Sequence, residues 1–352
     1  MVIRLIEAGT VSYLRSQTIY HGLAYAHTDE TPPTIVLARP AEPYVCIGFH
    51  QDIASEVDLE YCAAKGLPVL RRETGGGAVY LDSDQLFVQW VMGRDQLPQR
   101  NDRRFELFLQ PIVKTYQAFG IDAAVRSTND VHVEGRKIVG TGAAEIGNAE
   151  VLVGNFIFDF DKDAMTRVLK APSPAFRHQI RDSLEEYMTS TRQVSGKVLD
   201  PQKVASVYID ECSKTLGARL ETGTFTADEH AAIESMDQRL GSHEFQHGGG
   251  GLRRPGVKIH EDVYVAEATH DLPPLRVTAR IRSGHLESVV IDGPDNVNTL
   301  ANRICGLQVE RESVTDAVRL WLAQAGATPF AESTLVDTIL ELAKPQPVKT
   351  TS

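Results

Sequence analysis

A dense cluster of residues between positions 71 and 79 has the composition of an anion-binding loop. Two arginines lead into a threonine, three glycines and two small apolar residues: Arg71, Arg72, Thr74, Gly75, Gly76, Gly77, Ala78 and Val79. Glycines let a ligand approach the main chain closely, and their N–H groups can converge on an anion. The segment is neither a Walker loop nor a GxGxxG turn that opens a helix, because β-rich sequence follows it. The alternative interpretation is a glycine-rich hairpin turn beside two solvated arginines.

A second cluster, between positions 129 and 142, places a lysine in the arm of a predicted β-hairpin. Its members are Asn129, Asp130, Lys137, Gly140, Thr141 and Gly142, with the turn at Glu134 and Gly135. A lysine on a strand, flanked by apolar residues, can present a fixed positive charge to a phosphate or a carboxylate. Asn129 and Asp130 carry oxygens of the kind that suits Mg²⁺. The alternative interpretation is an exposed hairpin with routine charges.

The elements that must position these clusters alternate between strands and helices. Apolar runs bounded by turn residues predict strands at 34–38, 44–47, 68–71, 78–81, 86–92, 131–133, 137–139 and 151–158. A helix is expected at 56–65, and the strongest helical pattern lies at 103–119, where an apolar stripe ends before Gly120. β-rich sequence with helices packed to one side predicts an α+β fold with mixed or antiparallel sheets rather than a doubly wound parallel sheet.

The sequence pattern restarts after position 247. Prolines at 172, 174 and 201 mark a looser region, a helix is expected at 202–216, and the glycines at 248–251 give the one flexible-linker signal. Beyond them we expect strands at 263–268, 275–283 and 286–292 and helices at 313–324 and 332–343. We therefore predict a large domain over 1–245, a glycine-rich linker at 246–252, a small α+β domain over 253–345 and a mobile tail at 346–352.

Composition excludes several classes of function. The chain has 352 residues, with 36 Lys+Arg against 47 Asp+Glu and a formal net charge of −11. An acidic chain is poorly suited to nucleic acid or an anionic membrane as its main partner, and no stretch has the roughly 18–20 apolar residues of a membrane span. The four cysteines form no CxxC pair, which argues against a zinc site or a disulfide framework. With no secretory signal at the N-terminus, this predicts a cytoplasmic protein.

Taken together, the two clusters resemble the motifs of the lipoate-protein ligase family, in the group that also holds biotin protein ligases and lipoyl or octanoyl transferases. The matching segments are residues 71–80, 129–130 and 135–140, with further matches at Gly48, Gln51, Glu56, Thr189, Ser190, Arg192 and Val194. The resemblance covers about residues 1–220. It implies a biotin/lipoate ligase-like catalytic domain, and the small C-terminal module resembles the accessory domain of bacterial lipoate ligases.

The resemblance implies a two-step reaction at these clusters. Lipoic acid and ATP, with Mg²⁺, give lipoyl-adenylate and pyrophosphate, and the lipoyl group then passes to a lysine of a carrier protein. That carrier would be of the lipoyl-domain or H-protein type, and one branch of the family serves H-protein-like lipoate carriers of sulfur oxidation. Lys137 would be the catalytic residue that holds the lipoyl carbonyl and the α-phosphate.

The resemblance also implies roles for the other residues of the two clusters. Arg71 and Arg72 would face the phosphates, and the glycines at 75–77, with Thr74, Ala78 and Val79, would line the lipoyl and adenylate tunnel. Gly140, Thr141 and Gly142 would let the nucleotide lie close to the strand, and Asn155 could offer its amide to the adenosine. Asn129 and Asp130 would orient Lys137 or, in the case of Asp130, bind Mg²⁺.

The chain departs from the family pattern at three places. After Tyr80 the family commonly has His-Asp-x-Gly-Asn, where this chain has Leu81-Asp82-Ser83-Asp84-Gln85. Before the last core strand the family often has His-Gly-Thr, where Val153-Gly154-Asn155 stands here, and Gly140-Thr141-Gly142 replaces Gly-Ser-Ala. These positions lie in or near the predicted site, so they bear on substrate detail.

Two other functions are open on the sequence alone. Transferases of this superfamily accept the acyl group on a cysteine as a thioester, but Cys46 and Cys62 are expected to be small buried hydrophobic residues. A domain that binds lipoate or a lipoylated partner without activating it is the third possibility. Arg71, Arg72 and Lys137 argue against that domain, because a binder without catalysis has no use for a positioned phosphate cation.

Overall fold

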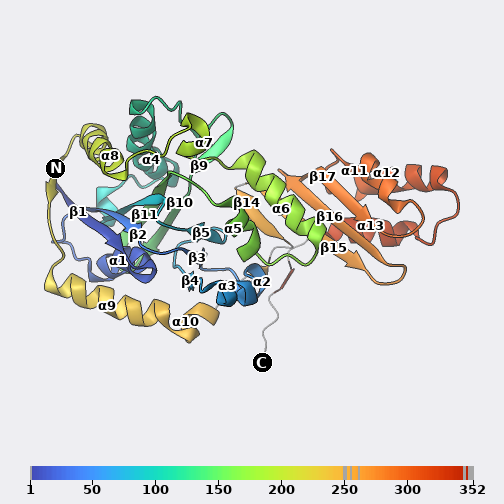
Figure 1. Cartoon of the computed structure of the whole chain (residues 1–352), viewed down its shortest axis with the longest axis horizontal. Helices are drawn as coiled ribbons and strands as arrows, with labels where there is room; N and C mark the ends of the chain where they lie inside the picture. The colour runs from blue at the N-terminus through green and yellow to red at the C-terminus, as the bar shows by residue number, and fades with distance from the viewer. Residues whose placement is uncertain (1, 249–251, 254–255, 261, 344–345, 348–352) are drawn as a thin grey trace. The chain divides into compact units, whose positions relative to one another are not determined.

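The computed structural model describes residues 2–248, 252–253, 256–260, 262–343 and 346–347. The chain forms two compact units, each assembled from three segments (Figure 1). Unit 1 comprises residues 1–49, 59–161 and 187–249, and unit 2 comprises residues 50–58, 162–186 and 250–352. The predicted linker glycines at 249–251 and the tail at 348–352 lie outside the described residues. No helix in the described ranges has the length and apolar character needed to cross a membrane.

A six-stranded mixed sheet forms the centre of unit 1. Its strands, in spatial order, are β10 (Thr141–Ile146), β11 (Ala149–Ile157), β6 (Gln85–Met92), β2 (Thr34–Pro40), β1 (Val2–Val11) and β12 (Arg219–Thr222). β1 is parallel to β2 and β12, whereas the pairs β2–β6, β6–β11 and β11–β10 are antiparallel. β6 is buried along its whole length, which is typical of a strand covered on both faces. The strands predicted at 34–38, 86–92 and 151–158 are confirmed.

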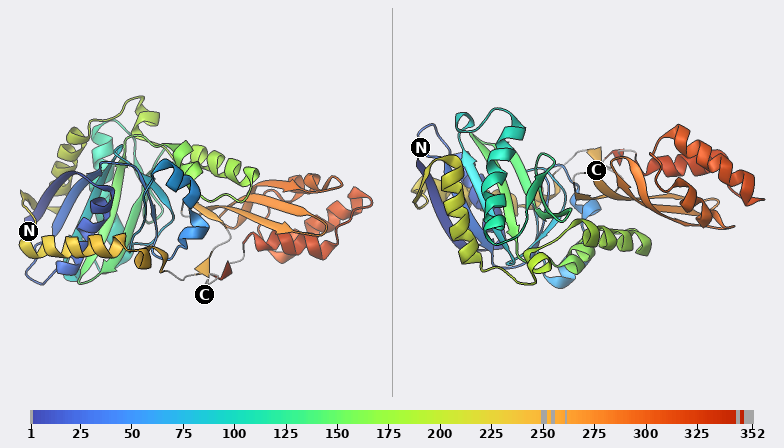
Figure 2. Two further views of the ribbon diagram at one scale, coloured as in Figure 1. Left: turned by 60° about the horizontal axis from the view of Figure 1, so that its bottom comes forward. Right: turned by 90° about the horizontal axis from the view of Figure 1, so that it is seen from above.

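Helices cover both faces of this sheet. On one face, α1 (Tyr13–Ala26) and α9 (Ala227–Gly241) pack together and share a core with β2 and β6. On the other face, α4 (Asn101–Ala118) and α8 (Pro201–Leu216) lie side by side (Figure 2). There Trp90 meets the ring of Phe108 edge-on and donates a hydrogen bond of 2.8 Å to the Tyr208 hydroxyl. The helices at 103–119 and 202–216 are confirmed, but the expectation of helices on one side is wrong.

Two three-stranded sheets and several short helices complete unit 1. One sheet has the order β4 (Val69–Arg71), β3 (Tyr44–Ile47), β5 (Val79–Leu81), and the other has the order β7 (Ala124–Arg126), β8 (Asp130–Val133), β9 (Arg136–Val139). The short helices are α3 (Leu59–Lys65), η1 (Arg94–Gln96), α7 (Thr191–Ser195) and α10 (His243–His247). The predicted turn between β8 and β9 is confirmed, with φ values of +51° at Glu134 and +80° at Gly135.

Unit 2 is built on a four-stranded antiparallel sheet. Its elements are β14 (Val257–His260), β15 (Val263–His270), β16 (Leu275–Arg282), β17 (His285–Asp292), η2 (Val297–Leu300), α11 (Ala301–Ile304), α12 (Arg311–Ala325) and α13 (Glu332–Glu341). The predicted strands and the two predicted helices of this region are confirmed. Also in unit 2 are α2 (Ile53–Glu56), α5 (Lys162–Val168), most of α6 (Pro174–Tyr187), and the paired strands β13 (Leu252–Arg253) and β18 (Gln346–Pro347).

The helix α6 corrects the expectation of a looser region around residues 172–201. Pro174 is its first residue, a position at which the missing N–H would have no helical partner in any case. The helix is attached to the sheet of unit 2 by polar contacts, among them the hydrogen bond of 2.8 Å from Gln179 Nε2 to Ser288 Oγ. The helix predicted at 56–65 is also shorter than expected and begins at Leu59, because Val57 and Asp58 bond to the segment around residue 168.

Candidate functional site

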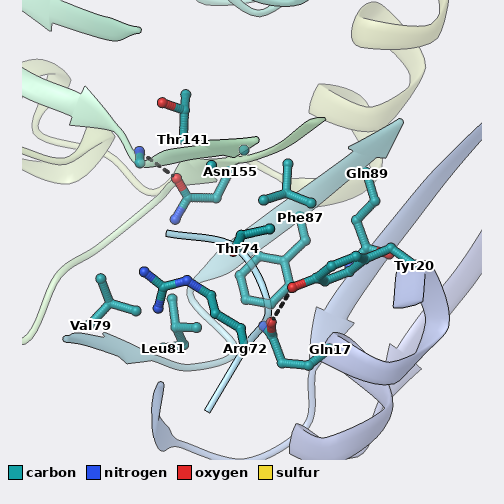
Figure 3. A pocket seen from close by; sticks show the side chains of 14 residues that line it. Gln17, Tyr20, Arg72, Thr74, Val79, Leu81, Phe87, Gln89, Thr141 and Asn155 are labelled. Carbon is teal, nitrogen blue, oxygen red and sulfur yellow. Dashed lines mark hydrogen bonds between the residues drawn. The ribbon is translucent and has the colours of Figure 1, made fainter. Parts of the chain in front are cut away.

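A cavity of about 110 Å³ lies in unit 1 on the α1 face of the six-stranded sheet. Four groups of residues line it, from α1, from the segment at 72–81, from β6, and from β10, β11 and the residue before β10 (Figure 3). The lining residues are Gln17, Tyr20, Arg72, Thr74, Val79, Leu81, Phe87, Gln89, Gly140, Thr141, Gly142, Val153, Gly154 and Asn155. The structure therefore brings the two sequence-predicted clusters together around one cavity.

Apolar side chains and glycines shape the walls of this cavity. Val79, Leu81, Phe87 and Val153 supply the apolar surface. At Gly142 a Cβ atom would lie 3.2 Å from Val153 and 3.4 Å from Thr74, so a larger residue would narrow the space between the strands. The lining suits a slim, largely apolar ligand with a polar group at one end.

Arg72 organises the predicted glycine loop by donating to its carbonyl groups. Its Nη2 lies 2.8 Å from the Gly75 oxygen and 2.9 Å from the Gly77 oxygen, and its Nη1 lies 3.1 Å from the Cys46 oxygen. Gly76 has φ +102°, and a Cβ atom there would lie 2.8 Å from Nη2. Arg72 thus lines the cavity, whereas the three glycines wrap around its guanidinium and are outside the lining, as is Ala78.

Arg71, the last residue of β4, does not line the cavity, and its side chain makes its contacts elsewhere. Its side chain is 1% exposed, and its guanidinium donates to the backbone oxygens of Phe49 at 2.7 Å and of Gln246 at 2.9 Å. The residue fixes α10 to β4. Its assignment to the phosphates stays a prediction, and the cavity as described has Arg72 alone of the two arginines in its lining.

Glu73 holds the same loop from the other side through contacts that the sequence did not predict. Its carboxylate pairs with Arg239 of α9 at 2.5 Å and accepts a hydrogen bond of 3.2 Å from the Tyr25 hydroxyl. Its backbone N–H donates to His21 Nε2 at 3.2 Å, while His21 Nδ1 is 2.8 Å from the backbone oxygen of Gln17. Burial lowers the pKa of His21 to about 4. The imidazole is therefore neutral and serves as donor to α1 and acceptor from the loop.

Lys137 lies on β9 and forms an ion pair with Asp130 of β8. The distance from Nζ to Oδ1 is 2.6 Å, and the two side chains are 16% and 3% exposed, respectively. Burial acts to raise the pKa of Asp130, but hydrogen bonds and positive charge from His132 and Lys137 outweigh it and hold that pKa below its usual value. Lys137 itself does not line the cavity, but the chain reaches the lining at Gly140, directly after β9.

The corner at Gly140 is held by two hydrogen bonds from other predicted site residues. The Gly140 N–H donates to Asn155 Oδ1 at 2.8 Å, and the Thr141 hydroxyl donates to the backbone oxygen of Asn129 at 2.6 Å. Asn155 Nδ2 in turn donates to Gln85 at 2.7 Å. Asn155 and Thr141 line the cavity, whereas Asn129 and Asp130 stand behind it.

Asn129 and Asp130 are chemically suited to a hard cation but form no built metal centre. The Asn129 Oδ1 atom is buried without a hydrogen-bond partner, and the Asp130 carboxylate is engaged by Lys137. In the part of the chain that the structure describes, no group of three His, Cys, Asp or Glu side chains is placed to hold a metal. The assignment of Mg²⁺ to Asp130 stays a prediction.

Half of the lining had no assigned role in the sequence analysis, although three of these residues stand at departures from the family pattern. The missed residues are Gln17, Tyr20, Leu81, Phe87, Gln89, Val153 and Gly154. The usable signal was polar residues inside buried elements, such as Gln89 among the apolar residues of β6 that follow Gln85. A second signal was the family departures, because Leu81, Val153, Gly154 and Asn155, which stand at departure positions, all line the cavity.

The cysteines of the described residues are separate from this lining. Cys46, Cys62 and Cys212 are buried, and Cys305, in unit 2, is exposed. Burial raises the pKa of the Cys46 thiol, although Arg72 acts to lower it, and burial raises that of Cys212 to about 12. The thiols of Cys46 and Cys212 are therefore protonated near neutral pH, whereas the thiolate is the nucleophilic form.

Comparison with known proteins agrees with this geometry. An octanoyltransferase LipM from Kyrpidia tusciae is 27% identical over 257 residues, which is 66% of this chain and 94% of that protein. The bi-partite lipoate protein ligase of Thermoplasma acidophilum, whose structural study includes its E2 lipoyl domain, has a TM-score of 0.64 and 26% identity, with 70% of this chain and 97% of that chain covered. A lipoate-protein ligase A bound with ATP shares the fold, with a TM-score of 0.60, 23% identity and coverage of 70% and 99%.

The family match spans the elements that build the cavity. It covers residues 13–213 and is described as the lipoyl protein ligase A/B catalytic domain. All lining residues, from Gln17 to Asn155, fall inside that range. The chain therefore belongs to the lipoyl protein ligase A/B catalytic domain family, and it is an enzyme of this lipoate-ligase and octanoyltransferase group.

Proposed function

We propose that this enzyme is an ATP-dependent lipoate-protein ligase. The lipoate carboxylate attacks the α-phosphorus of ATP, forming the mixed anhydride lipoyl-AMP as the bond to pyrophosphate breaks. The amine of a carrier lysine then attacks the acyl carbon, which forms an amide and releases AMP. The apolar walls of the cavity would hold the acyl chain, and the Arg72 and Gly140 end would hold the carboxylate and the nucleotide.

The observation that carries this proposal over a thioester transferase is the absence of a thiol from the cavity. Among the described residues, no cysteine contributes to its lining. Cys46 contacts a lining residue, since its backbone oxygen accepts from Arg72, but its side chain is fully buried. Acyl transfer through a thioester requires an accessible thiolate at the acyl group. Activation by ATP requires none.

Positive charge near Gly140 fits the adenylation step. Attack of a carboxylate on a phosphate brings two anions together, so fixed cations and N–H donors stabilise the charge that develops. Arg72 lines the cavity, and Lys137 is held three residues before Gly140 by its ion pair with Asp130. In the proposed mechanism Lys137 contacts the acyl carbonyl and the α-phosphate, and Asp130 positions its ammonium group.

Magnesium and the carrier protein enter as partners of the reaction. Mg²⁺ would arrive with the ATP phosphates, and Asp130 and the buried oxygen of Asn129 would be its protein-side donors. The carrier would be a lipoyl domain or an H-protein-like protein that presents its lysine to the adenylate. The ligase of Thermoplasma acidophilum, which was studied with its E2 lipoyl domain, supports the first of these.

Pyrophosphate release tests the proposal directly. The full chain, supplied with ATP, Mg²⁺ and lipoate, should release pyrophosphate and, with a lipoyl-domain substrate, increase the carrier mass by one lipoyl group. Lys137→Met should abolish release. The matched control is Lys162→Met, because Lys162 is also buried and ion-paired, with Glu185 at 2.8 Å, but lies in unit 2. That variant should keep its turnover per folded molecule.

One observation favours an octanoyltransferase as the second candidate. The LipM relative is matched over 94% of its own length, so the ATP-independent activity needs its own assay. The enzyme should be given an octanoyl thioester of an acyl carrier protein and a lipoyl domain without ATP. Octanoylation of the carrier there, together with no pyrophosphate release from lipoate and ATP, would replace the ligase proposal.

A further inference from the structure

The two cations proposed to act in adenylation are carried by different sheets. Arg72 directly follows β4 of the sheet β4–β3–β5, and Lys137 lies on β9 of the sheet β7–β8–β9. The strands β6 and β11, which also line the cavity, belong to a third, six-stranded sheet. Stabilisation of one phosphate by both cations needs a fixed geometry between them. The position of one small sheet relative to the other therefore matters for the reaction.

A chain of hydrogen bonds through two side-chain amides crosses from one small sheet to the other. The Gly140 N–H, directly after β9, donates to Asn155 Oδ1 at 2.8 Å (Figure 3). Asn155 Nδ2 donates to Gln85 Oε1 at 2.7 Å, and Gln85 Nε2 donates to the backbone oxygen of Tyr80 at 3.3 Å. Tyr80 lies on β5, Gln85 on β6 and Asn155 on β11. The chain thus ties β5 to the corner after β9 across the six-stranded sheet.

Both amides in this chain have a fixed orientation. The Gly140 N–H can only donate, so it requires Asn155 Oδ1. The Tyr80 backbone oxygen can only accept, so it requires Gln85 Nε2. The remaining Asn155 Nδ2 and Gln85 Oε1 are then a matched donor and acceptor. These two side chains are 8% and 1% exposed, respectively, and a buried amide that loses its partner is unfavourable. The chain therefore resists displacement of either end.

The chain connects two parts of the cavity lining through a residue outside that lining. Asn155 lines the cavity and bonds to the lining residue Gly140, whereas Gln85 is not among the lining residues. At the other end, Tyr80 stands in β5 between two residues that line the cavity. A substitution of Gln85 can therefore act on a ligand in this cavity through its hydrogen-bond partners rather than by direct contact.

We propose that Asn155 and Gln85 are positioning residues that fix the corner after β9 relative to the loop that carries Arg72. The inference rests on the proposed function of Arg72 and Lys137 in adenylation. A displacement of about 1 Å at a reacting group can cost about 100-fold in rate, so a partial loosening of the corner should cost about tenfold. Neither amide needs to contact the phosphates for this effect.

Steady-state pyrophosphate release by the full chain, with lipoate, ATP and Mg²⁺, tests the inference. Gln85→Met keeps the side-chain length but removes both amide bonds, and Asn155→Ala removes the bond to Gly140. Each should lower kcat about tenfold and change the KM values for ATP and lipoate by less than about twofold, because a positional shift acts on the transition state. The double variant should be no slower than Asn155→Ala, since Gln85 then has no partner through which to act on the corner.

Tyr208→Phe is the matched control for the loss of a buried hydrogen bond. It removes the 2.8 Å bond from Trp90, which lies on the α4 face of the six-stranded sheet, opposite the cavity. Its melting temperature should fall by a similar amount, but it should keep the kcat of the parent. A Gln85→Met protein that melts far below the parent is replaced by Gln85→Asn, whose amide is on a side chain too short to span Asn155 and Tyr80.

Hydrogen exchange gives a second measurement that does not depend on the reaction. The backbone amides at 136–142 should exchange faster in Gln85→Met than in the parent, because the corner after β9 loses its connection to β5. Tyr208→Phe should leave the exchange of that segment unchanged. Equal exchange at 136–142 in the parent and in Gln85→Met would overturn the inference.

The outcomes separate the inference from the function on which it rests. A parent protein that releases no pyrophosphate removes the proposed function, and the exchange at 136–142 then decides the inference. If the parent is active, a Gln85→Met protein with the kcat of the parent overturns the inference, whatever its melting temperature. Losses in kcat that multiply in the double variant also overturn it. So does an Asn155→Ala protein that changes only in a raised KM for ATP, because Asn155 would then contact the nucleotide directly.

Discussion

Replacing Asp130 by asparagine should destabilise the protein by about 3 kcal/mol. The Asp130 carboxylate is 3% exposed and lies 2.6 Å from the Lys137 ammonium, whose side chain is 16% exposed. Removing one partner of a buried ion pair costs about 3–5 kcal/mol, because the other charge stays buried and unpaired. We take the lower end of that range, since Lys137 keeps some contact with water and an asparagine oxygen can still accept a hydrogen bond.

A double-mutant cycle over Asp130→Asn and Lys137→Met measures this interaction by chemical denaturation. Each single variant leaves an unpaired buried charge, whereas the double variant leaves none. The double variant should therefore be more stable than the sum of the single losses indicates, with a coupling of about 1–3 kcal/mol. In thermal melts each kcal/mol should correspond to a Tm shift of about 2–4 °C for a domain of this size.

The pH dependence gives an independent check on the same pair. The pKa of Asp130 is below its usual value in the folded protein, so its stabilising effect is fully present above about pH 4, the pKa of an unfolded aspartate. The effect is lost as the pH falls through the folded-state pKa. The stability difference between the parent and Asp130→Asn should therefore shrink as the pH falls from about 4 into stronger acid. An additive cycle, or a difference that grows as the pH falls below about 4, would refute the reasoning.

The remaining predictions use neighbouring residues as controls for one another. Gly76→Ala should lower the free energy of unfolding by about 1–3 kcal/mol in a denaturation experiment, because Gly76 has φ +102° and the added Cβ would clash with Arg72. Gly75→Ala should leave that free energy unchanged, since no atom lies within 4 Å of the added Cβ. Arg71→Met should lower the unfolding free energy by about 2–3 kcal/mol and leave the KM for ATP unchanged. Arg72→Met should also destabilise the protein, because its bonds to the glycine loop are lost, but it should raise the KM for ATP as well. An Arg71→Met protein of normal stability with a raised KM would instead support a phosphate-binding role for Arg71. Burial, with the nearby charges of other carboxylates, raises the pKa of Asp82 to about 6, so its folded form loses stability as the pH rises through 6. Asp82→Asn should then be about 1–2 kcal/mol more stable than the parent at pH 8 and equal to it near pH 3, and equal stability at both pH values would contradict this.

Sequence patterns predicted the elements that bury apolar side chains, such as α4, and missed an element that buries polar side chains, α1. The apolar stripe of α4 fixed its position to within two residues at each end. Helix α1 gave no such stripe, because its buried residues include Gln17, Thr18 and His21. Gln17 lines the cavity, His21 accepts from the backbone of the glycine loop, and Thr18 donates to Asp237 of α9. The sequence pattern therefore did not predict this helix, because buried polar residues interrupt its apolar stripe.

The different contacts of the adjacent Arg71 and Arg72 could not be predicted from the sequence motif that they share. Both stand before the glycine run, and the sequence assigned both to phosphate. Arg72, directly after β4, lines the cavity, whereas Arg71, the last residue of β4, donates to the backbone oxygens of Phe49 and Gln246. The Gln246 contact joins segments 175 residues apart, and no local pattern reports it.

The same contacts extend the site beyond the family match, which ends at residue 213. α10 accepts from Arg71, and Arg239 of α9 pairs with Glu73, so both neighbours of Arg72 are held by the segment at 227–247. Under the proposed function Arg72 faces a phosphate, and a guanidinium that is fixed before the ligand arrives needs no binding energy to order it. The helices that follow the matched region thus support the loop that carries Arg72.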